Sequence, residues 1–303
     1  MGVNRTGIKS SMNVSVIIPT IAIKEKEPLL RRAVESIRRS SANQVRIIAV
    51  VNGGRADHGI CQWLKTQSDI HYERVAIPSY PLAVLRGREL VQTPFFSFLD
   101  DDDEYLIGGT DLKLSAFSSH TDADAVITSG FRNHGEIDEP AMSSIEQVPL
   151  APLTSLFDSN WLSSCNSLYR SSSFPPAFFA DPHPYAKWTW LAFKLALAGK
   201  QLVAINQPTF RIHDTPGSLS KSKSYHDAYQ ALYRRMLDFD PPIDVVRTIR
   251  VRMSSDWHDQ SVRALLRGGR LDAITCHLRS LMLPGGLRYL TYTRRLVPRW
   301  PKS

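Results

Sequence analysis

The chain has 303 residues, of which 43% are hydrophobic and 22% charged, so it is long enough for one large domain or two smaller ones with a substantial core. The three cysteines, Cys61, Cys165 and Cys276, lie far apart, which argues against a zinc site or a disulfide framework and favours a reducing, cytoplasmic setting. The polar residues 1–13 lack the apolar segment of a signal peptide, and the longest apolar stretch, residues 14–23, is far below the ~20 residues that span a bilayer.

The N-terminal third of the chain predicts strands that alternate with helices. Runs rich in Val, Ile and Phe are typical of strands, and apolar residues at helical spacing are typical of amphipathic helices. The predicted strands cover residues 14–20, 45–51, 71–77 and 95–99, and the predicted helices cover residues 27–39, 59–65 and 82–91. Such alternation indicates a parallel sheet with right-handed crossovers. We therefore expect an α/β fold of the Rossmann-like kind, with a mostly parallel sheet flanked by helices.

The rest of the chain becomes more helical toward its end. We expect a strand over residues 123–129, an irregular polar segment over 131–160, a helix over 188–198 and a strand over 201–206. After Tyr225 the pattern is helical, with breaks at Pro241-Pro242, Gly268-Gly269 and Pro284-Gly285-Gly286. This organisation predicts an α/β domain over residues 12–222 and a basic helical C-terminal extension over residues 223–303.

Five consecutive acidic residues, Asp100 to Glu104, follow the predicted strand over residues 95–99. Like charges this close repel each other, and a divalent cation offsets that cost. Mg²⁺ and Mn²⁺ prefer oxygen ligands, often one or two carboxylates plus substrate phosphates. Ligands of open α/β sheets also bind at the carboxyl ends of strands. The acidic run therefore indicates a metal site, and the alternative is an acidic turn that caps the strand or the following helix.

Three segments together carry a family resemblance. They are the strand Val14-Ser15-Val16-Ile17-Ile18-Pro19-Thr20, the turn at Asn52-Gly53 and the acidic run after Phe98-Leu99. A fourth segment, Arg211-Ile212-His213 with Ser218 and Ser220 after it, strengthens the match. Over roughly residues 12–222 the chain resembles the inverting glycosyltransferases of family 2, which have the A-type nucleotide-sugar-binding fold.

The resemblance implies a role for several of these residues. Thr20, Asn52, Arg86, Asp100 and Asp101 would bind the nucleotide sugar: Thr20 would line the nucleotide pocket, Asn52 would read the nucleobase, and Arg86 would face the base or a phosphate. Asp102 and His213 would hold the metal, Mn²⁺ or Mg²⁺. Departure of a nucleoside diphosphate develops negative charge, which a bound cation stabilises.

The catalytic base departs from the family pattern. Relatives carry an acid, often as Glu-Asp, just before a helix of the type that begins at Trp188, where this chain has Ala186 and Lys187. A protonated lysine is no base, and only real burial would lower its pKa enough. Asp181 and His183 are the nearby alternatives, and their other interpretation is a surface loop stiffened by prolines.

The resemblance implies a metal-dependent transfer of a sugar from a nucleotide-diphosphate sugar to a hydroxyl of a glycan or lipid-linked acceptor, in cell-surface polysaccharide synthesis. Because the expected base is missing, a non-catalytic relative that binds a nucleotide sugar or supports a partner enzyme is the main alternative. A nucleotidyltransferase is a third hypothesis, which the lack of a Gly-rich phosphate loop with an activating lysine disfavours. Trp161 is either a platform for an acceptor sugar or a packed aromatic residue.

The excess positive charge is confined to the C-terminal fifth of the chain. Residues 244–303 hold twelve Lys and Arg but four Asp and Glu, which accounts for the net charge of +8 and leaves 25 residues of each sign in residues 1–243. Leucines and aromatic residues interleaved with arginines suit a helix on an anionic membrane surface. The alternative is a helical appendage whose leucines pack on the catalytic domain. No motif supports nucleic-acid binding, so we expect a cytoplasmic protein, peripheral on the inner membrane face.

Overall fold

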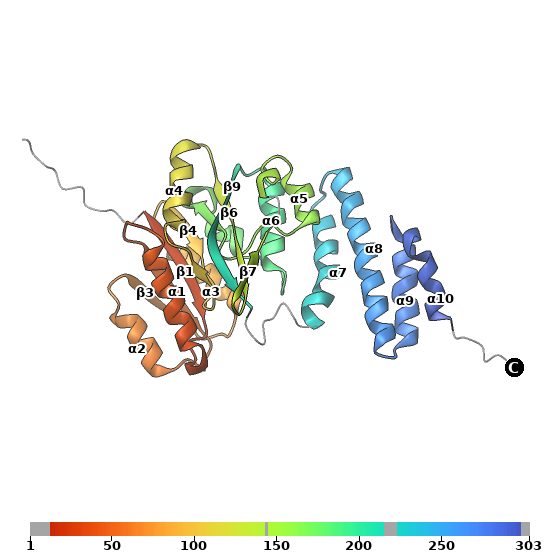
Figure 1. Cartoon of the computed structure of the whole chain (residues 1–303), viewed down its shortest axis with the longest axis horizontal. Helices are drawn as coiled ribbons and strands as arrows, with labels where there is room; N and C mark the ends of the chain where they lie inside the picture. Colours follow the sequence, from red (N-terminus) through yellow and green to blue (C-terminus); the bar gives the residue numbers. More distant parts are fainter. Residues whose placement is uncertain (1–12, 143–144, 215–222, 298–303) are drawn as a thin grey trace, which may run out of the picture. The chain divides into compact units, whose positions relative to one another are not determined.

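The computed structural model describes residues 13–142, 145–214 and 223–297, and the chain divides into two compact units (Figure 1). The first, called the α/β unit here, comprises residues 1–182 and 187–218. The second, called the helical unit, comprises residues 183–186 and 219–303. The sequence led us to expect domains over residues 12–222 and 223–303. The two units divide the chain at residues 218 and 219, and a short segment before the predicted helix at 188–198 also belongs to the helical unit.

The α/β unit begins with four parallel strands, as expected. They are β1 (Val14–Thr20), β2 (Arg46–Asn52), β3 (Ile70–Val75) and β4 (Phe95–Phe98), and they lie in the order β3-β2-β1-β4. The connections are the 3₁₀ turn η1 (Lys24–Lys26) and the helices α1 (Glu27–Arg39), α2 (His58–Thr66) and α3 (Tyr80–Glu89). Every residue of β1 is buried, because helices cover both faces of a central parallel strand.

The second half of the sheet is mixed rather than parallel. The strand β8 (Ser167–Arg170) runs antiparallel between β4 and β6 (Ala125–His134), and β9 (Leu202–His213) runs parallel to β6. Short antiparallel strands, β5 (Glu104–Tyr105) and β7 (Ile137–Pro140), pair with β9 and β6. The segment 131–160, which we expected to be irregular, thus holds the end of β6, β7, the turn η2 (Ile145–Gln147) and the helix α5 (Pro152–Asp158).

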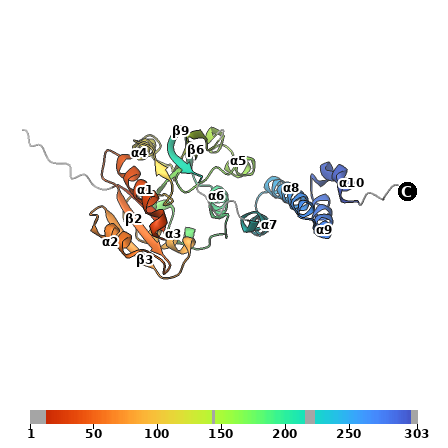
Figure 2. The same cartoon turned by 60° about the horizontal axis from the view of Figure 1, so that its bottom comes forward.

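The remaining helices of the α/β unit are α4 (Gly109–Ser119) and α6 (Lys187–Leu197), with the 3₁₀ turns η3 (Ser171–Ser173) and η4 (Pro176–Phe179) between β8 and α6. Figure 2 shows the strands and helices of this unit from a second side. An aromatic cluster is built around β4. It consists of Phe96 and Phe98 of that strand with Tyr169, Phe179 and Trp188. This cluster joins β4, which leads into the acidic run, to the start of α6.

The helical unit contains α7 (Lys223–Leu237), α8 (Ile243–Leu266), α9 (Arg270–Leu281), the 3₁₀ segment η6 (Gly286–Tyr292) and α10 (Thr293–Leu296). The breaks between these elements fall at the proline and glycine positions expected from the sequence. Small residues let α8 and α9 approach closely, since the hydroxyls of Ser254 and Ser280 donate to each other's backbone carbonyls. Among the described residues, no helix is both long and apolar enough to cross a membrane.

Candidate active site

The acidic run lies at the carboxyl edge of the parallel strands. The strand β4 ends at Phe98, and Asp100 to Asp103 follow it beside the last residues of β1 and β2. Because parallel strands end at the same edge of a sheet, this edge brings together polar residues that are far apart in the sequence. The hydroxyl of Thr20 donates to Oδ2 of Asp101 at 2.6 Å, and the side-chain amide of Asn52 donates to the carbonyl of Thr20 at 3.0 Å.

Asp101 is one of two buried carboxylates of the run. Lys26 donates to its Oδ1 at 3.2 Å, and the same ammonium lies 3.8 Å from Oδ2 of Asp102. Burial raises the pKa of Asp101, against the attraction of Lys26 and the hydrogen bond from Thr20. Asp101 therefore ties β1 and η1 to the run, and both of its oxygens have protein partners.

Asp100 is held from two sides by hydroxyl groups. The Tyr80 hydroxyl, at the start of α3, donates to its Oδ1 at 2.5 Å, and the Ser164 hydroxyl donates to its Oδ2 at 2.9 Å. Burial, followed by the negative charge of Asp100, raises the pKa of Tyr80 well above its usual value, so the phenol stays protonated as a donor. The carboxylate of Asp100 is thus held in one orientation before a ligand binds at this edge of the sheet.

Asp103 anchors the end of the run and is 4% exposed. Its Oδ1 accepts from the backbone N–H of His213 at 3.0 Å, while Arg32 donates to the carbonyl of Asp102 at 2.5 Å. Burial, together with the charges of Asp100 and Asp102, raises the pKa of Asp103 well above its usual value. Asp103 is thus a structural link between the run and β9.

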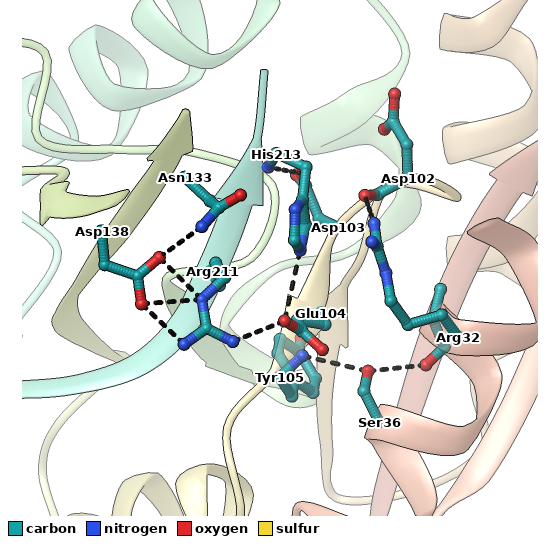
Figure 3. A network of polar contacts seen from close by, with 11 residues as sticks. Arg32, Ser36, Asp102, Asp103, Glu104, Tyr105, Asn133, Asp138, Arg211 and His213 are labelled. Atoms are coloured by element: carbon teal, nitrogen blue, oxygen red, sulfur yellow. Dashed lines mark hydrogen bonds and ion pairs between the residues drawn. The ribbon is translucent and has the colours of Figure 1, made fainter. Parts of the chain in front are cut away.

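His213 belongs to a polar network that Figure 3 shows from close by. Its Nε2 lies 3.2 Å from Glu104, and Arg211 forms ion pairs with Glu104 and Asp138. Burial lowers the pKa of His213, and the charge of Arg32 acts in the same direction. The imidazole points toward Glu104, whereas the carboxylate of Asp102 points away from it (Figure 3). The side chains of Asp102 and His213, the two predicted metal ligands, therefore do not point toward a common position.

A divalent cation fits this edge through the carboxylate of Asp102. That side chain is 20% exposed and offers the oxygen atoms that Mg²⁺ and Mn²⁺ prefer. Within the described ranges, no group of three or more His, Cys, Asp or Glu side chains is placed to hold a metal ion. The donor set thus suits an ion that takes one protein carboxylate and completes its shell with phosphate oxygens and water.

The other predicted residues form their contacts with groups outside the acidic run. Arg86 of α3 forms ion pairs with Glu73 of β3 and with Glu89 of its own helix. Asp181 accepts from the ammonium of Lys194, and Trp161 is 3% exposed with its indole N–H donating to the carbonyl of Pro152. Trp161 is therefore the packed aromatic residue of the two alternatives.

His183 belongs to the helical unit. Its Nε2 lies 3.2 Å from the carbonyl oxygen of Ala228, and burial lowers its pKa. Ser218 and Ser220 lie outside the described residues.

Three residues at the site were not predicted to bind there: Lys26, Tyr80 and Lys187. Tyr80 and Lys187 each begin a helix, α3 and α6, and only the packing of those helices brings them to the acidic run. The Nζ atom of Lys187 lies 3.2 Å from the centre of the Tyr80 ring. No sequence signal identifies such a contact, although the unexpected lysine at the position of an acid marks Lys187 as unusual.

A small pocket opens next to Lys187 in the α/β unit. Its wall is mostly apolar and includes Pro81, Val84, Phe179, Lys187 and Trp188. Because Lys187, which lines the pocket, also lies over the Tyr80 ring, the pocket adjoins the side of the site that α3 and α6 form.

Comparison with known proteins identifies the family to which the chain is similar. The family model of glycosyl transferase family 2 matches residues 15–176. No curated protein sequence matches the chain. Among solved structures, residues 1–349 of Staphylococcus aureus TarS in complex with UDP-GlcNAc are similar, with a TM-score of 0.57, 12% identity and coverage of 89% of this chain and 91% of that one.

The same TarS fragment in complex with UDP has a TM-score of 0.55 and 13% identity, with coverage of 96% of this chain and 94% of that one. At such identity the likeness concerns the fold. It confirms the expected A-type fold, a sheet flanked by helices that is followed by a helical C-terminal region.

Proposed function

The chain belongs to glycosyl transferase family 2, and on that premise we propose that this glycosyltransferase moves a sugar from a UDP-sugar to a hydroxyl of a glycan or lipid-linked acceptor. The observation that carries the proposal is the acidic run at the carboxyl edge of β1, β2 and β4, with Asp100 fixed by Tyr80 and Ser164. The choice of uridine rests on the UDP and UDP-GlcNAc complexes of TarS.

On the donor side, each residue would have a distinct task. Asn52 and Thr20, which are joined by a hydrogen bond, would shape the pocket for the nucleoside at the ends of β1 and β2. Asp100 would bind the ribose or the metal-bound diphosphate. Asp102 would hold the Mn²⁺ or Mg²⁺ ion, which when bound would stabilise the negative charge of the departing diphosphate. His213 would add to this shell only after leaving Glu104, so we assign it a supporting role.

On the acceptor side, the proton of the attacking hydroxyl needs a base. Ala186 has no titratable side chain, and the ammonium of Lys187 has no lone pair to accept a proton. Asp181 is the carboxylate that we propose for this task, and its side chain is 44% exposed beside Lys194. We keep His183 as the second candidate, because burial lowers its pKa and favours the neutral imidazole that a base requires.

The helical unit would bind an anionic membrane on the cytoplasmic face, where lipid-linked acceptors of cell-surface polysaccharides are extended. Large apolar side chains are exposed on it, among them Leu266, Leu271, Met282, Leu287 and Leu290. They accompany the arginines that carry the net positive charge of residues 244–303. Exposed leucines beside arginines match the chemistry of an anionic lipid surface.

Sedimentation of the full chain with vesicles tests this surface. We expect binding to vesicles that contain phosphatidylglycerol and not to phosphatidylcholine alone, with weaker binding as the salt concentration rises. Equal binding to both kinds of vesicle, or to neither, would contradict the proposed membrane contact.

The transferase activity is tested by a screen of nucleotide sugars for hydrolysis and transfer, with and without Mn²⁺. The wild-type chain should turn over one UDP-sugar in the presence of Mn²⁺, and Asp102→Ala should lose that turnover. Metal-dependent binding without turnover on any acceptor would instead favour a non-catalytic relative. Binding of no nucleotide sugar at all would refute the proposal.

A further inference from the structure

Lys187 stands at one of the two positions where the family resemblance leads us to expect an acid. It is the first residue of α6, and its ammonium lies over the Tyr80 ring, 3.2 Å from the ring centre. The hydroxyl of the same ring donates to Asp100. A single aromatic ring therefore separates the lysine from the acidic run.

The charges of the run reach this ammonium. Burial lowers the pKa of Lys187, and the carboxylates of Asp100 and Asp102 act against that effect by attracting the charged form. Lys187 thus lies close enough to the two carboxylates proposed for the donor site to sense their charge. The cation is part of the same electrostatic environment as the acids.

The ammonium of Lys187 has no oxygen partner in the part of the chain that the structure describes. Among the described residues, none forms a hydrogen bond or ion pair with its Nζ, whereas Lys26 bonds to Asp101 and Lys194 bonds to Asp181. A cation–π contact with Tyr80 compensates only part of the cost of burying a charge. The hydrogens of the ammonium that do not face the ring therefore remain for an anionic ligand.

We propose that Lys187 binds the β-phosphate of the nucleoside diphosphate and so supplies a fixed positive charge for the leaving group. This assignment rests on the proposed transferase function, which brings the diphosphate to Asp100 and Asp102. A lysine ammonium is a compact point charge that suits phosphate oxygens. The substitution of an expected acid by lysine thus changes the task of this position from accepting a proton to stabilising the departing diphosphate.

The test compares nucleoside diphosphates with monophosphates by isothermal titration calorimetry. UDP, GDP, ADP, CDP and dTDP are titrated into wild-type protein with Mn²⁺, and the tightest ligand and its monophosphate are then titrated into Lys187→Met. Relative to the wild type, we expect Lys187→Met to raise the Kd of the diphosphate at least tenfold and to change the Kd of the monophosphate less than twofold. Lys187→Arg, which keeps the charge, should retain most of the affinity.

Lys200→Met is the matched control, because Lys200 also lies over an aromatic ring, that of Phe174, near the far end of α6. It should bind both ligands as the wild type does. Lys187→Gln serves as a second variant if Lys187→Met fails to fold, as judged by circular dichroism. An unchanged diphosphate Kd in the folded variant, or equal weakening of both ligands, would overturn the assignment. Failure of the wild-type protein to bind any nucleoside diphosphate would overturn the proposed function itself.

Discussion

At the scale of single residues, the site consists of carboxylates that the protein fixes through hydroxyl and ammonium groups. Asp100 takes its hydrogen bonds from Tyr80 and Ser164, and Asp101 takes its bonds from Thr20 and Lys26. Such pre-organised charges need no rearrangement when a ligand arrives, which is the main source of electrostatic stabilisation in enzymes.

Tyr80→Phe should weaken turnover without unfolding the chain. The change removes one hydrogen bond to a charged carboxylate, which is worth about 1.5–3 kcal/mol, and so predicts a loss of roughly tenfold to a hundredfold in kcat/KM. Steady-state kinetics of the sugar transfer measure it. Tyr289→Phe, which removes a hydroxyl bonded to Ser255 in the helical unit, is the control and should be close to wild type. Equal activity of the two variants would contradict the role of Tyr80.

Lys113→Met should reduce the increase in the free energy of unfolding between pH 7 and pH 10. Lys113 is 1% exposed, and burial lowers its pKa from 10.5 to about 7. Between these values the unfolded chain binds a proton that the folded chain lacks, so stability rises with pH, by up to about 1.4 kcal/mol per pH unit for one group. Urea unfolding at several pH values should show the wild type gaining stability relative to Lys113→Met from pH 7 to 10. A constant difference would show that Lys113 stays protonated in the fold.

Part of the candidate site could be predicted from the sequence. Thr20, Asn52 and Asp100 to Asp103 could be predicted, because strand ends and motif spacing place them at one edge. The convergence of Asp102 and His213 does not appear in the structure, since His213 turns to Glu104. Tyr80 and Lys187 could not be predicted, because their contacts depend on how α3 and α6 pack.

At the scale of elements, the close approach of β6 and β9 shapes the second half of the sheet. A Cβ atom at Gly130 would lie 2.5 Å from the ring of Phe210, which is fully buried one residue before Arg211. The glycine lets the two parallel strands approach and thereby positions the segment that carries Arg211 and His213.

Gly130→Ala should destabilise the α/β unit by roughly 1–3 kcal/mol, the usual cost of overpacking a core. Thermal unfolding followed by circular dichroism measures the change. Gly54→Ala is the control, because a Cβ atom there would meet nothing within 4 Å. If both variants unfold at the wild-type temperature, Phe210 moves aside freely and the close approach has no energetic role.

Element predictions succeeded where the apolar pattern was strong. The strand β1 and the helix α1 have the predicted bounds, because one is apolar throughout and the other has a clear apolar face. The strands β7 and β8 were missed for opposite reasons. All four residues of β7 are exposed, so no apolar alternation marks it, and β8 is a short strand whose direction depends on partners far along the chain.

At the scale of the whole molecule, the two units have separate sources of stability. The helical unit contains a stacked group in which His258 lies 3.9 Å from the Tyr289 ring and His277 lies near Tyr292. The Nδ1 atoms of both histidines are buried without a hydrogen-bond partner among the described residues. Burial lowers the pKa of His258 and of His277 below 6.5.

The helical unit should therefore loosen in mild acid. Well above pH 6.5 both imidazoles are neutral in the folded and the unfolded chain. As the pH is lowered through 6.5, the unfolded chain binds protons that the folded unit disfavours, so the stability of the helical unit decreases as the pH decreases. Amide hydrogen exchange at pH 7.5 and 5.5, corrected for intrinsic rates, should show protection lost in α8 and α9 before β1 and β2. Loss that is uniform over both units would contradict this prediction.

The central claim is that the nucleoside diphosphate of the donor binds at the acidic run. The most direct measurement is a crystal structure of the wild-type chain with UDP and Mn²⁺, with anomalous difference density to place the ion. We predict an anomalous peak on the carboxylate of Asp102, the uracil near Asn52 and the β-phosphate within hydrogen-bond distance of the Lys187 ammonium. Nucleotide density away from the carboxyl ends of β1 and β4, or an ion peak that avoids Asp102, would contradict the account.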